Sequence, residues 1–305
     1  MRLSKSDKRK KNWKSVLKRN LLGWAFMIVP LLLFLFFVWY PMGRNFLLAF
    51  QDGYENPSFV GFQNFVDIFE DSRFLSAFRN TFLYIGWSLL IGYLVPVILG
   101  FLLSEVIHAK GLFRVVLYLP CMISGMAVVF LFNSMYGDGS QDLFNVIITH
   151  LGLEPHPWKG STNLVIPLIV LAMTWKGAGS TALIYLSSFQ SIDDSMYEAA
   201  RMDGATAGQR FFRITIPALK GTLLTLFVLQ IISVFQVFYE PLVIGPNGGP
   251  LDASMSLMLL SYLYAFNDFE YGKSAATALV LGLIIIVFTL AYYMLDRLLK
   301  RTEGK

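Results

Sequence analysis

The sequence predicts an all-α, polytopic membrane protein with six transmembrane helices. Of its 305 residues, 55% are hydrophobic and only 15% are charged, whereas a soluble domain usually carries about 25% charged residues. The apolar residues also gather into runs of the length that a helix needs to cross the hydrocarbon core, roughly 17–25 residues. The six runs are Leu22–Pro41, Thr81–Leu103, Phe113–Phe132, Leu164–Leu186, Thr222–Ile244 and Ala275–Leu295.

The first apolar run is predicted to be a retained transmembrane helix. It follows a basic segment, as in a signal peptide, but it is longer than the 7–15 apolar residues typical of one. It also ends in Trp39 and Tyr40, and such residues are enriched at the membrane interface. We therefore divide the chain into a cytoplasmic basic segment, residues 1–20, and a single transmembrane domain, residues 21–300.

The basic residues predict the orientation of the chain, because Lys and Arg are enriched in cytoplasmic segments. Nineteen of the 25 lie in the N-terminal segment, in the second and fourth loops and in the C-terminal tail, and only five lie in the other loops. Both termini are therefore expected in the cytoplasm, as an even number of crossings also requires. The basic residues do not form a patch for nucleic acid.

The loop between the fourth and fifth runs, residues 188–217, has the most distinctive pattern. Glu198-Ala199-Ala200-Arg201 is followed by Asp203-Gly204 and, after nine further residues, by Ile214-Thr215-Ile216-Pro217. The capping-box spacing of Ser195 and Glu198 predicts a helix that starts near Asp194 or Ser195. Gly204 is expected to end that helix in a left-handed conformation. A second short helix, capped by Thr206, is expected over residues 207–213.

In an inside loop after the fourth of six runs, this spacing resembles the EAA loop of type I ABC importer permeases, where the permease meets its ATPase. Further motifs are similar to those of the carbohydrate-uptake group of these permeases. They are Phe59-Val60-Gly61-Phe62-Gln63-Asn64-Phe65, Phe78-Arg79-Asn80-Thr81, Leu117-Tyr118-Leu119-Pro120, Phe235-Gln236-Val237-Phe238, Gly248-Gly249-Pro250 and Tyr271-Gly272-Lys273-Ser274-Ala275-Ala276. The chain departs from the usual pattern at Ile216, where Leu is common, and at Tyr239-Glu240-Pro241.

The resemblance implies the MetI-like transmembrane domain of a type I ABC importer and the ATP-driven uptake of a sugar or oligosaccharide across a bacterial or archaeal inner membrane. The implied partners are a second, homologous permease, two cytoplasmic ABC ATPase subunits and an extracytoplasmic solute-binding protein. ATP would bind to those ATPases, so the chain itself is expected to have neither a cofactor nor catalytic residues. The expected contacts with the ATPase are Glu198, Ala199, Ala200, Arg201, Asp203 and Gly204.

Polar groups within the apolar runs are candidates for the substrate path, because they are costly in a membrane unless they serve a function. Aromatic faces and hydrogen-bonding side chains also suit a sugar. Gln236 and Glu240 are expected to share a helix face, since they are four residues apart. Structural roles stay open: Lys176 can pair with Glu240, Gln230 can join two helices, and Trp175 can serve packing alone. The candidates are Trp175, Lys176, Gln230, Gln236, Tyr239 and Glu240.

Two other functions are open to a polytopic protein. A stand-alone secondary transporter would need coupling acids in its spans and usually carries a repeat, and a membrane enzyme would need clustered His or carboxylates; we find neither pattern. The sequence has no P-loop for ATP. No metal site is expected, because no His–carboxylate pair has ligand spacing and Cys121 is the single cysteine.

Overall fold

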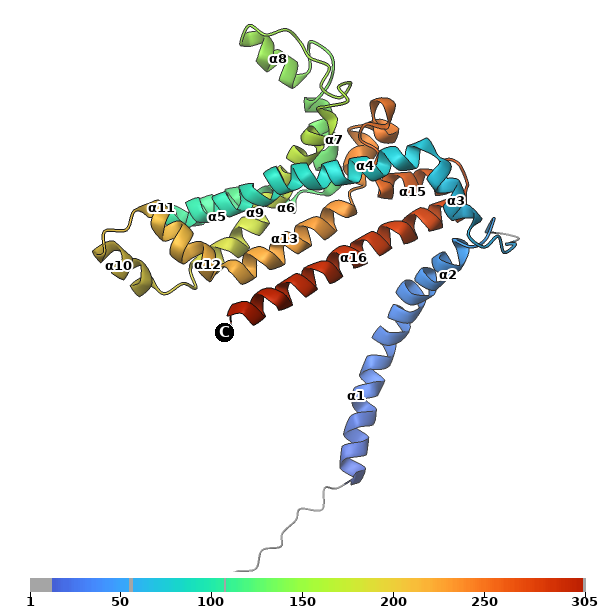
Figure 1. Cartoon of the computed structure of the whole chain (residues 1–305), viewed down its shortest axis with the longest axis horizontal. Helices are drawn as coiled ribbons and strands as arrows, with labels where there is room; N and C mark the ends of the chain where they lie inside the picture. Colours follow the sequence, from blue (N-terminus) through green and yellow to red (C-terminus); the bar gives the residue numbers. More distant parts are fainter. Residues whose placement is uncertain (1–12, 55–56, 107, 304–305) are drawn as a thin grey trace, which may run out of the picture.

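The structure is a computed structural model that describes residues 13–54, 57–106 and 108–303, so most of the predicted basic segment lies outside the described residues. The chain begins with a long helical arm. The arm consists of α1 (Trp13–Phe34), the π-helical turn η1 (Leu35–Trp39) and α2 (Tyr40–Leu48). It leaves the other helices at an angle, and α2 packs on the C-terminal helix α16 (Tyr271–Glu303) (Figure 1). The apolar side chains of α1 whose burial is described, from Leu21 to Phe34, are exposed.

The second span is joined closely to the fourth. It is built from α4 (Ser72–Trp87), the π-helical segment η2 (Ser88–Tyr93) and α5 (Leu94–Glu105), and it follows the short outer helix α3 (Gln63–Glu70). Helix α9 (Val165–Phe189) packs along α5. Gly100 permits this contact, because a Cβ at that position would lie 2.8 Å from Tyr185 Cβ and 2.9 Å from the Ala182 carbonyl oxygen.

The third span is broken, which corrects the prediction of one continuous helix over Phe113–Phe132. Helix α6 (Lys110–Met122) and helix α7 (Gly125–Met135) meet at an angle of 92°. Ile123 and Ser124 between them have extended ψ angles of 140° and 137°. Hydropathy does not report this break, because the residues on both sides of it are apolar.

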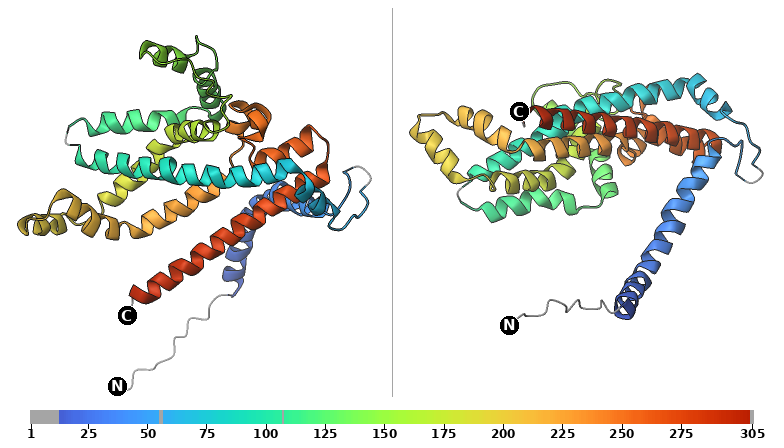
Figure 2. Two further views of the ribbon diagram at one scale, coloured as in Figure 1. Left: turned by 45° about the horizontal axis from the view of Figure 1, so that its top comes forward. Right: turned by 60° about the horizontal axis from the view of Figure 1, so that its bottom comes forward.

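A small folded unit follows α7 and stands apart from the spans (Figures 1 and 2). It contains α8 (Leu143–His150), and its centre is the fully buried Asn145. The amide nitrogen of Asn145 donates to the Gly139 and His156 carbonyls at 2.9 and 3.1 Å. Its oxygen accepts from the Trp158 indole at 2.8 Å. This one buried side chain therefore joins α8 to the segments on both sides of it.

The loop between spans four and five forms α10 (Asp194–Met202) and α11 (Ala207–Arg210). α11 runs on without a break into the π-helical turn η3 (Phe211–Thr215) and α12 (Ile216–Ala218), and α13 (Lys220–Phe235) follows after a turn at Leu219. The expected second helix of the loop therefore begins at Ala207 but extends past residue 213 to Ala218, ahead of the fifth span, which begins at Lys220. It lies with α10 at one end of the molecule (Figure 1).

The fifth span is interrupted near its outer end. Helix α13 ends at Phe235, and α14 (Tyr239–Val243) begins after Phe238, whose φ of −141° is not helical. Gln236 and Glu240 consequently lie on opposite sides of a break, and the expectation that they share a helix face is wrong. Two short 3₁₀ turns, η4 (Pro246–Gly248) and η5 (Pro250–Asp252), and helix α15 (Leu257–Phe266) then lead to α16.

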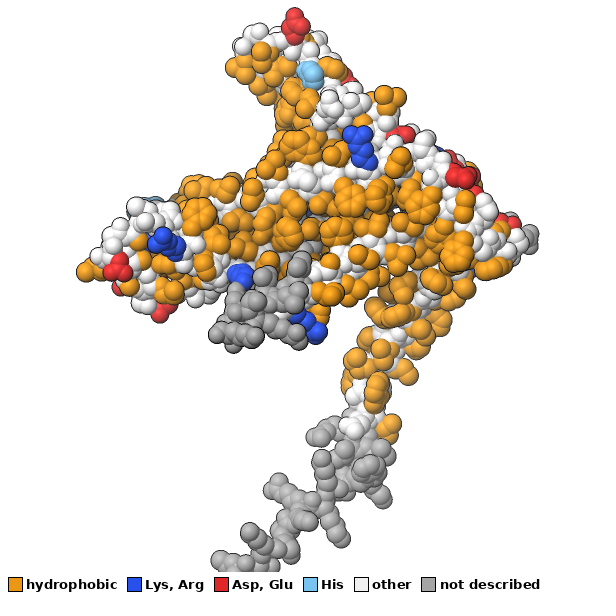
Figure 3. All heavy atoms as spheres, viewed as in Figure 1, with side chains coloured by type: hydrophobic (Ala, Val, Ile, Leu, Met, Phe, Trp, Pro, Cys, Tyr) orange, Lys and Arg blue, Asp and Glu red, His pale blue; other side chains and the backbone are white. Residues whose placement is uncertain are grey.

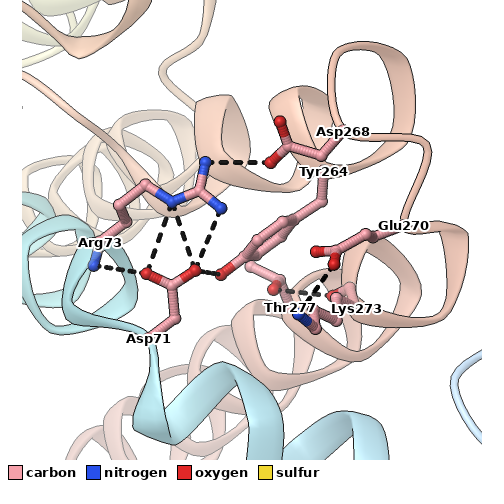
Figure 4. A network of polar contacts seen from close by, with 7 residues as sticks. All are labelled: Asp71, Arg73, Tyr264, Asp268, Glu270, Lys273 and Thr277. Carbon is pink, nitrogen blue, oxygen red and sulfur yellow. Dashed lines mark hydrogen bonds and ion pairs between the residues drawn. The ribbon is translucent and has the colours of Figure 1, made fainter.

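A cluster of charges fastens the start of α4 to the α15–α16 turn (Figure 4). The Arg73 guanidinium lies 3.1 Å from the Asp71 carboxylate and 2.9 Å from that of Asp268. The Tyr264 hydroxyl donates to Asp71 at 2.8 Å. Burial alone would raise the pKa of Asp71, but these hydrogen bonds outweigh it and hold the pKa below its ordinary value.

Together these elements form the predicted all-α membrane fold. In the described part of the chain, five helical segments are long and apolar enough to cross a membrane, and counting the bent pair α6–α7 as one broken span gives six. On the face shown in Figure 3, apolar side chains cover the middle of the molecule, and the charged ones gather towards its ends. This distribution is what a bilayer requires of the surface that meets the lipid chains.

Candidate functional site: the loop between spans four and five and the polar groups of the spans

Helix α10 carries the EAA residues on an exposed surface. Asp193 is its N-cap and accepts the Ser195 backbone N–H at 3.0 Å. The predicted start of the helix is confirmed, but Asp193 caps it in place of Ser195. Hydrogen bonding from Ser195 holds the pKa of Asp193 below its ordinary value. Ala200 is half-buried, and the other predicted contact residues are exposed: Glu198, Ala199, Arg201, Asp203 and Gly204.

Gly204 ends α10 as the sequence predicted. Its φ is +74°, a conformation in which a side chain would be strained. The Gly204 N–H donates to the Arg201 carbonyl at 3.0 Å, and the next N–H reaches the Ala200 carbonyl at 2.9 Å. Thr206 caps the following helix, as expected, by accepting the Gln209 N–H at 3.3 Å. The loop is thus a helical hairpin with a sharp, defined turn.

The six candidates for the substrate path fall into two groups. Gln230 lines a polar cavity of about 200 Å³ between spans two, four and five, where its amide donates to Ser88 Oγ at 2.6 Å. Gly92 leaves room for that amide, since a Cβ there would lie 2.8 Å from Gln230 Nε2. The cavity therefore lies beside the π-helical part of the second span, and such segments are frequent at functional sites.

The second group lies around the breaks in the third and fifth spans. Trp175 is 41% exposed and packs edge-on against Phe132 of α7 at 5.5 Å. The Lys176 stem passes the start of α7, where a Cβ on Gly125 would lie 3.8 Å from Lys176 Cε. α14, which begins with Tyr239 and Glu240, contacts both α7 and α9.

Lys176 and Glu240 do not form an ion pair in this structure: within the described part of the chain, no contact of 4 Å or less joins them. Gln236 and Tyr239 are exposed, and the Gln236 amide donates to its own helix at the Ile232 carbonyl, 3.1 Å away. The structure therefore places the other five candidates near the two helix breaks and sets Gln230 apart in the cavity.

Sequence reasoning missed several polar residues that line the cavity with Gln230. Ser88, Thr174 and Thr181 contribute hydroxyl groups from spans two and four. Each is a small polar residue inside an apolar run, which is itself a signal. Their convergence on one cavity was not available, because it depends on how three spans cross.

A bundle of membrane crossings with a polar helical hairpin at one end and polar groups between its spans defines a transport subunit. Residues 107–301 match the family of binding-protein-dependent transport system inner membrane components. The chain belongs to this family. It is therefore a multi-pass inner-membrane permease of an ABC importer, works in a complex with a solute-binding protein, and is not itself catalytic.

Individual relatives agree with this assignment. The chain is 33% identical to the probable ABC transporter permease protein YurN of Bacillus subtilis, covering 86% of this chain and 92% of that one. It is 32% identical to the arabinooligosaccharides transport system permease protein AraP of the same organism, covering 84% and 82%. It superimposes with a TM-score of 0.83 on a chain of a bacterial ABC transporter involved in alginate import, at 26% identity and covering 94% and 99%.

Proposed function

We propose that this chain is one of two homologous permeases in an importer for a sugar or oligosaccharide. The names of its relatives support a carbohydrate, since they include transport systems for arabinooligosaccharides and lactose. The exposed apolar arm α1–α2 supports a second permease, because a long helix that packs on its own chain only at one end has a surface free for a partner. Two ATPases inside and the binding protein outside complete the complex.

The loop at residues 188–217 is the coupling element. Within it, α10 presents Glu198 and Arg201 to the partner ATPase, and Gly204 sets the turn that brings the chain back to span five. The observation that carries this assignment is the exposed helix α10, which stands at one end of the molecule and ends in a left-handed glycine. A short exposed helix of this kind can be moved as a unit by a partner.

The substrate path runs between the spans, past the Gln230 cavity and the helix breaks near Lys176 and Glu240. Broken helices free backbone groups for a ligand or for water, which a membrane protein tolerates only where they line a cavity. The position of α10 and the basic residues of the tail support an inside location for both termini, with α3 and α8 outside.

The coupling assignment is tested by Glu198→Lys and Gly204→Asp in the complete transporter. Both variants are expected to reach the membrane but to lose transport and substrate-stimulated ATP hydrolysis. A lost charge-assisted hydrogen bond costs about 1.5–3 kcal/mol, and a residue with a side chain in a left-handed turn adds about 1–2 kcal/mol.

Matched controls lie in the outer unit. Gly152 also has a positive φ, +81°, with open space around it, and Glu154 is exposed. Gly152→Asp and Glu154→Lys therefore reproduce the backbone strain and the charge reversal far from the loop, and both are expected to transport normally. Normal substrate-stimulated ATP hydrolysis in the Glu198 and Gly204 variants would refute the assignment.

A further inference from the structure

Helix α10 has few attachments to the spans. None of its nine residues is buried, and two short segments of chain connect it to the neighbouring helices. Tyr197 is half-buried, and its hydroxyl oxygen lies 2.8 Å from Thr215 Oγ1. This contact is a direct side-chain link between the exposed helix α10 and the turn that leads into the fifth span.

Thr215, in contrast, is buried inside the protein. It is 2% exposed and is the last residue of η3, directly before the Ile216-Pro217 pair. Its hydroxyl faces the Arg210 carbonyl at 3.5 Å, so it can donate there while it accepts the Tyr197 proton.

The turn η3 is itself anchored on two spans. The Phe211 ring packs on Phe101 of the second span with 5.0 Å between centroids, and Phe101 packs on Phe189 of the fourth at 6.0 Å. The same spans line the polar cavity around Gln230. Tyr197 and Thr215 thus connect α10 to a turn that packs on two of the spans that line the cavity.

We propose that the Tyr197–Thr215 hydrogen bond is a coupling strut, which makes Tyr197 and Thr215 positioning residues. It keeps α10 at a fixed angle to spans two, four and five, so a displacement of α10 by the ATPase moves those spans. Without this hydrogen bond, α10 changes its angle to the spans when the ATPase displaces it, so part of that displacement is not passed on to the spans. The inference rests on the proposed coupling function of the loop and names the residues that transmit the motion.

The test uses the complete transporter with both permeases, the ATPases and the binding protein. Tyr197→Phe and Thr215→Val each remove a hydroxyl with little change of shape, and Thr215→Ser keeps it. We expect the first two to lower the amount of substrate imported per ATP hydrolysed at least threefold, while the ATPases still copurify with the permease. Thr215→Ser should retain most of the coupling, and the double variant should be no worse than either single variant.

Tyr54→Phe and Thr225→Val are the matched controls, since both hydroxyls lie on exposed residues outside the loop, and they should couple normally. An unchanged ratio of import to hydrolysis in Tyr197→Phe and Thr215→Val would overturn the strut, as would effects that add in the double variant. Loss of ATPase copurification would also overturn it, because the residues would then serve docking. If Glu198→Lys, Tyr197→Phe and Thr215→Val all couple normally, the proposed coupling function of the loop is wrong. If Glu198→Lys is inactive while Tyr197→Phe and Thr215→Val couple normally, only the strut proposal is wrong.

Discussion

At the scale of single residues, the motifs before spans two and six are hydrogen-bonding centres of the outer end. The buried Asn64 amide donates to the Ala49 and Gln51 carbonyls at 2.9 and 2.8 Å. The Asn80 amide donates to the Asp252 carbonyl at 2.6 Å. It so holds the turn in which Asp252 has a φ of +58°. Gly272 completes the first centre by leaving space for Asn64. These side chains hold together the outer connections that lead into spans two and six.

The first residue-scale prediction concerns Gly272. A Cβ there would lie 2.5 Å from both Asn64 Nδ2 and the Gln51 carbonyl oxygen. Gly272→Ala should therefore separate these groups and lower the unfolding free energy by about 1–3 kcal/mol, the cost of an unsatisfied buried polar group. Thermal unfolding in detergent measures this. Gly282→Ala on the same helix, with open space around it, should leave the midpoint nearly unchanged; equal midpoints for both variants would contradict the prediction.

The second residue-scale prediction concerns Lys176 and Glu240. Since no ion pair joins them in this structure, we expect Lys176→Met and Glu240→Gln each to leave membrane abundance nearly intact and to change uptake rate or substrate preference. An unpaired charge at mid-depth otherwise costs about 2.5–3.5 kcal/mol, so Lys176 needs a wet cavity. Abundance and uptake are measured for both single variants and the double variant. Loss of abundance in the single variants that is restored in the double one would identify a structural pair instead.

At the scale of elements, the spans differ in how they are held. Helices α5 and α9 pack closely through Gly100, and α6 lies on α9 at Gly179, where a Cβ would overlap the Leu117 carbonyl. The breaks at residues 123–124 and 236–238, by comparison, leave α7 and α14 as separate short helices. The continuous spans form a frame, and the short pieces and α10 are the parts that a partner or ligand can move.

The element-scale prediction concerns the mobility of α10. Isolated helices shorter than about 12–15 residues are marginal in water, and α10 has nine residues with none buried. Amide hydrogens of residues 194–202 should therefore exchange quickly in the permease alone and at least tenfold more slowly when the ATPases are bound. Hydrogen-exchange mass spectrometry measures both states. The buried residues of α9 serve as the internal control, and unchanged exchange in α10 would contradict its role as the docking helix.

At the scale of the whole molecule, the helices form a compact body with one arm outside it (Figure 2). α10 and the α3 region lie at opposite ends of the body, and the arm contacts it through α2. Exposed apolar side chains such as Trp24, Phe26 and Phe37 suit a membrane or another permease. The arrangement is that of one part of a larger complex.

The whole-molecule prediction concerns sidedness. Single cysteines at position 16, 300 or 154 in a Cys121→Ser background are treated in intact cells with a membrane-impermeant thiol reagent. Positions 16 and 300 should react only after the cells are opened, because both termini are expected inside, and position 154 should react at once. Labelling of position 16 or 300 from outside would overturn the proposed orientation.

The sequence by itself determined the fold class, the five continuous apolar spans and the ends of α10. The length of an apolar run predicts a membrane span directly, because the thickness of the bilayer sets how long an apolar helix must be. Gly204 and Thr206 predict the helix ends because they act on the backbone next to them. Such signals are local and can be read from neighbouring residues. The EAA spacing likewise pointed to the family that the comparisons confirm.

Only the tertiary structure decided where the polar groups of the spans meet. The break at Ile123–Ser124 is hidden inside continuous apolar sequence, and the break after Phe235 separates Gln236 from Glu240 despite their helical spacing. The convergence of Ser88 with Gln230, and of Tyr197 with Thr215, joins residues 142 and 18 positions apart. Contacts of this kind depend on how helices cross, which is set by small residues such as Gly100 and Gly179 and by the packing around them.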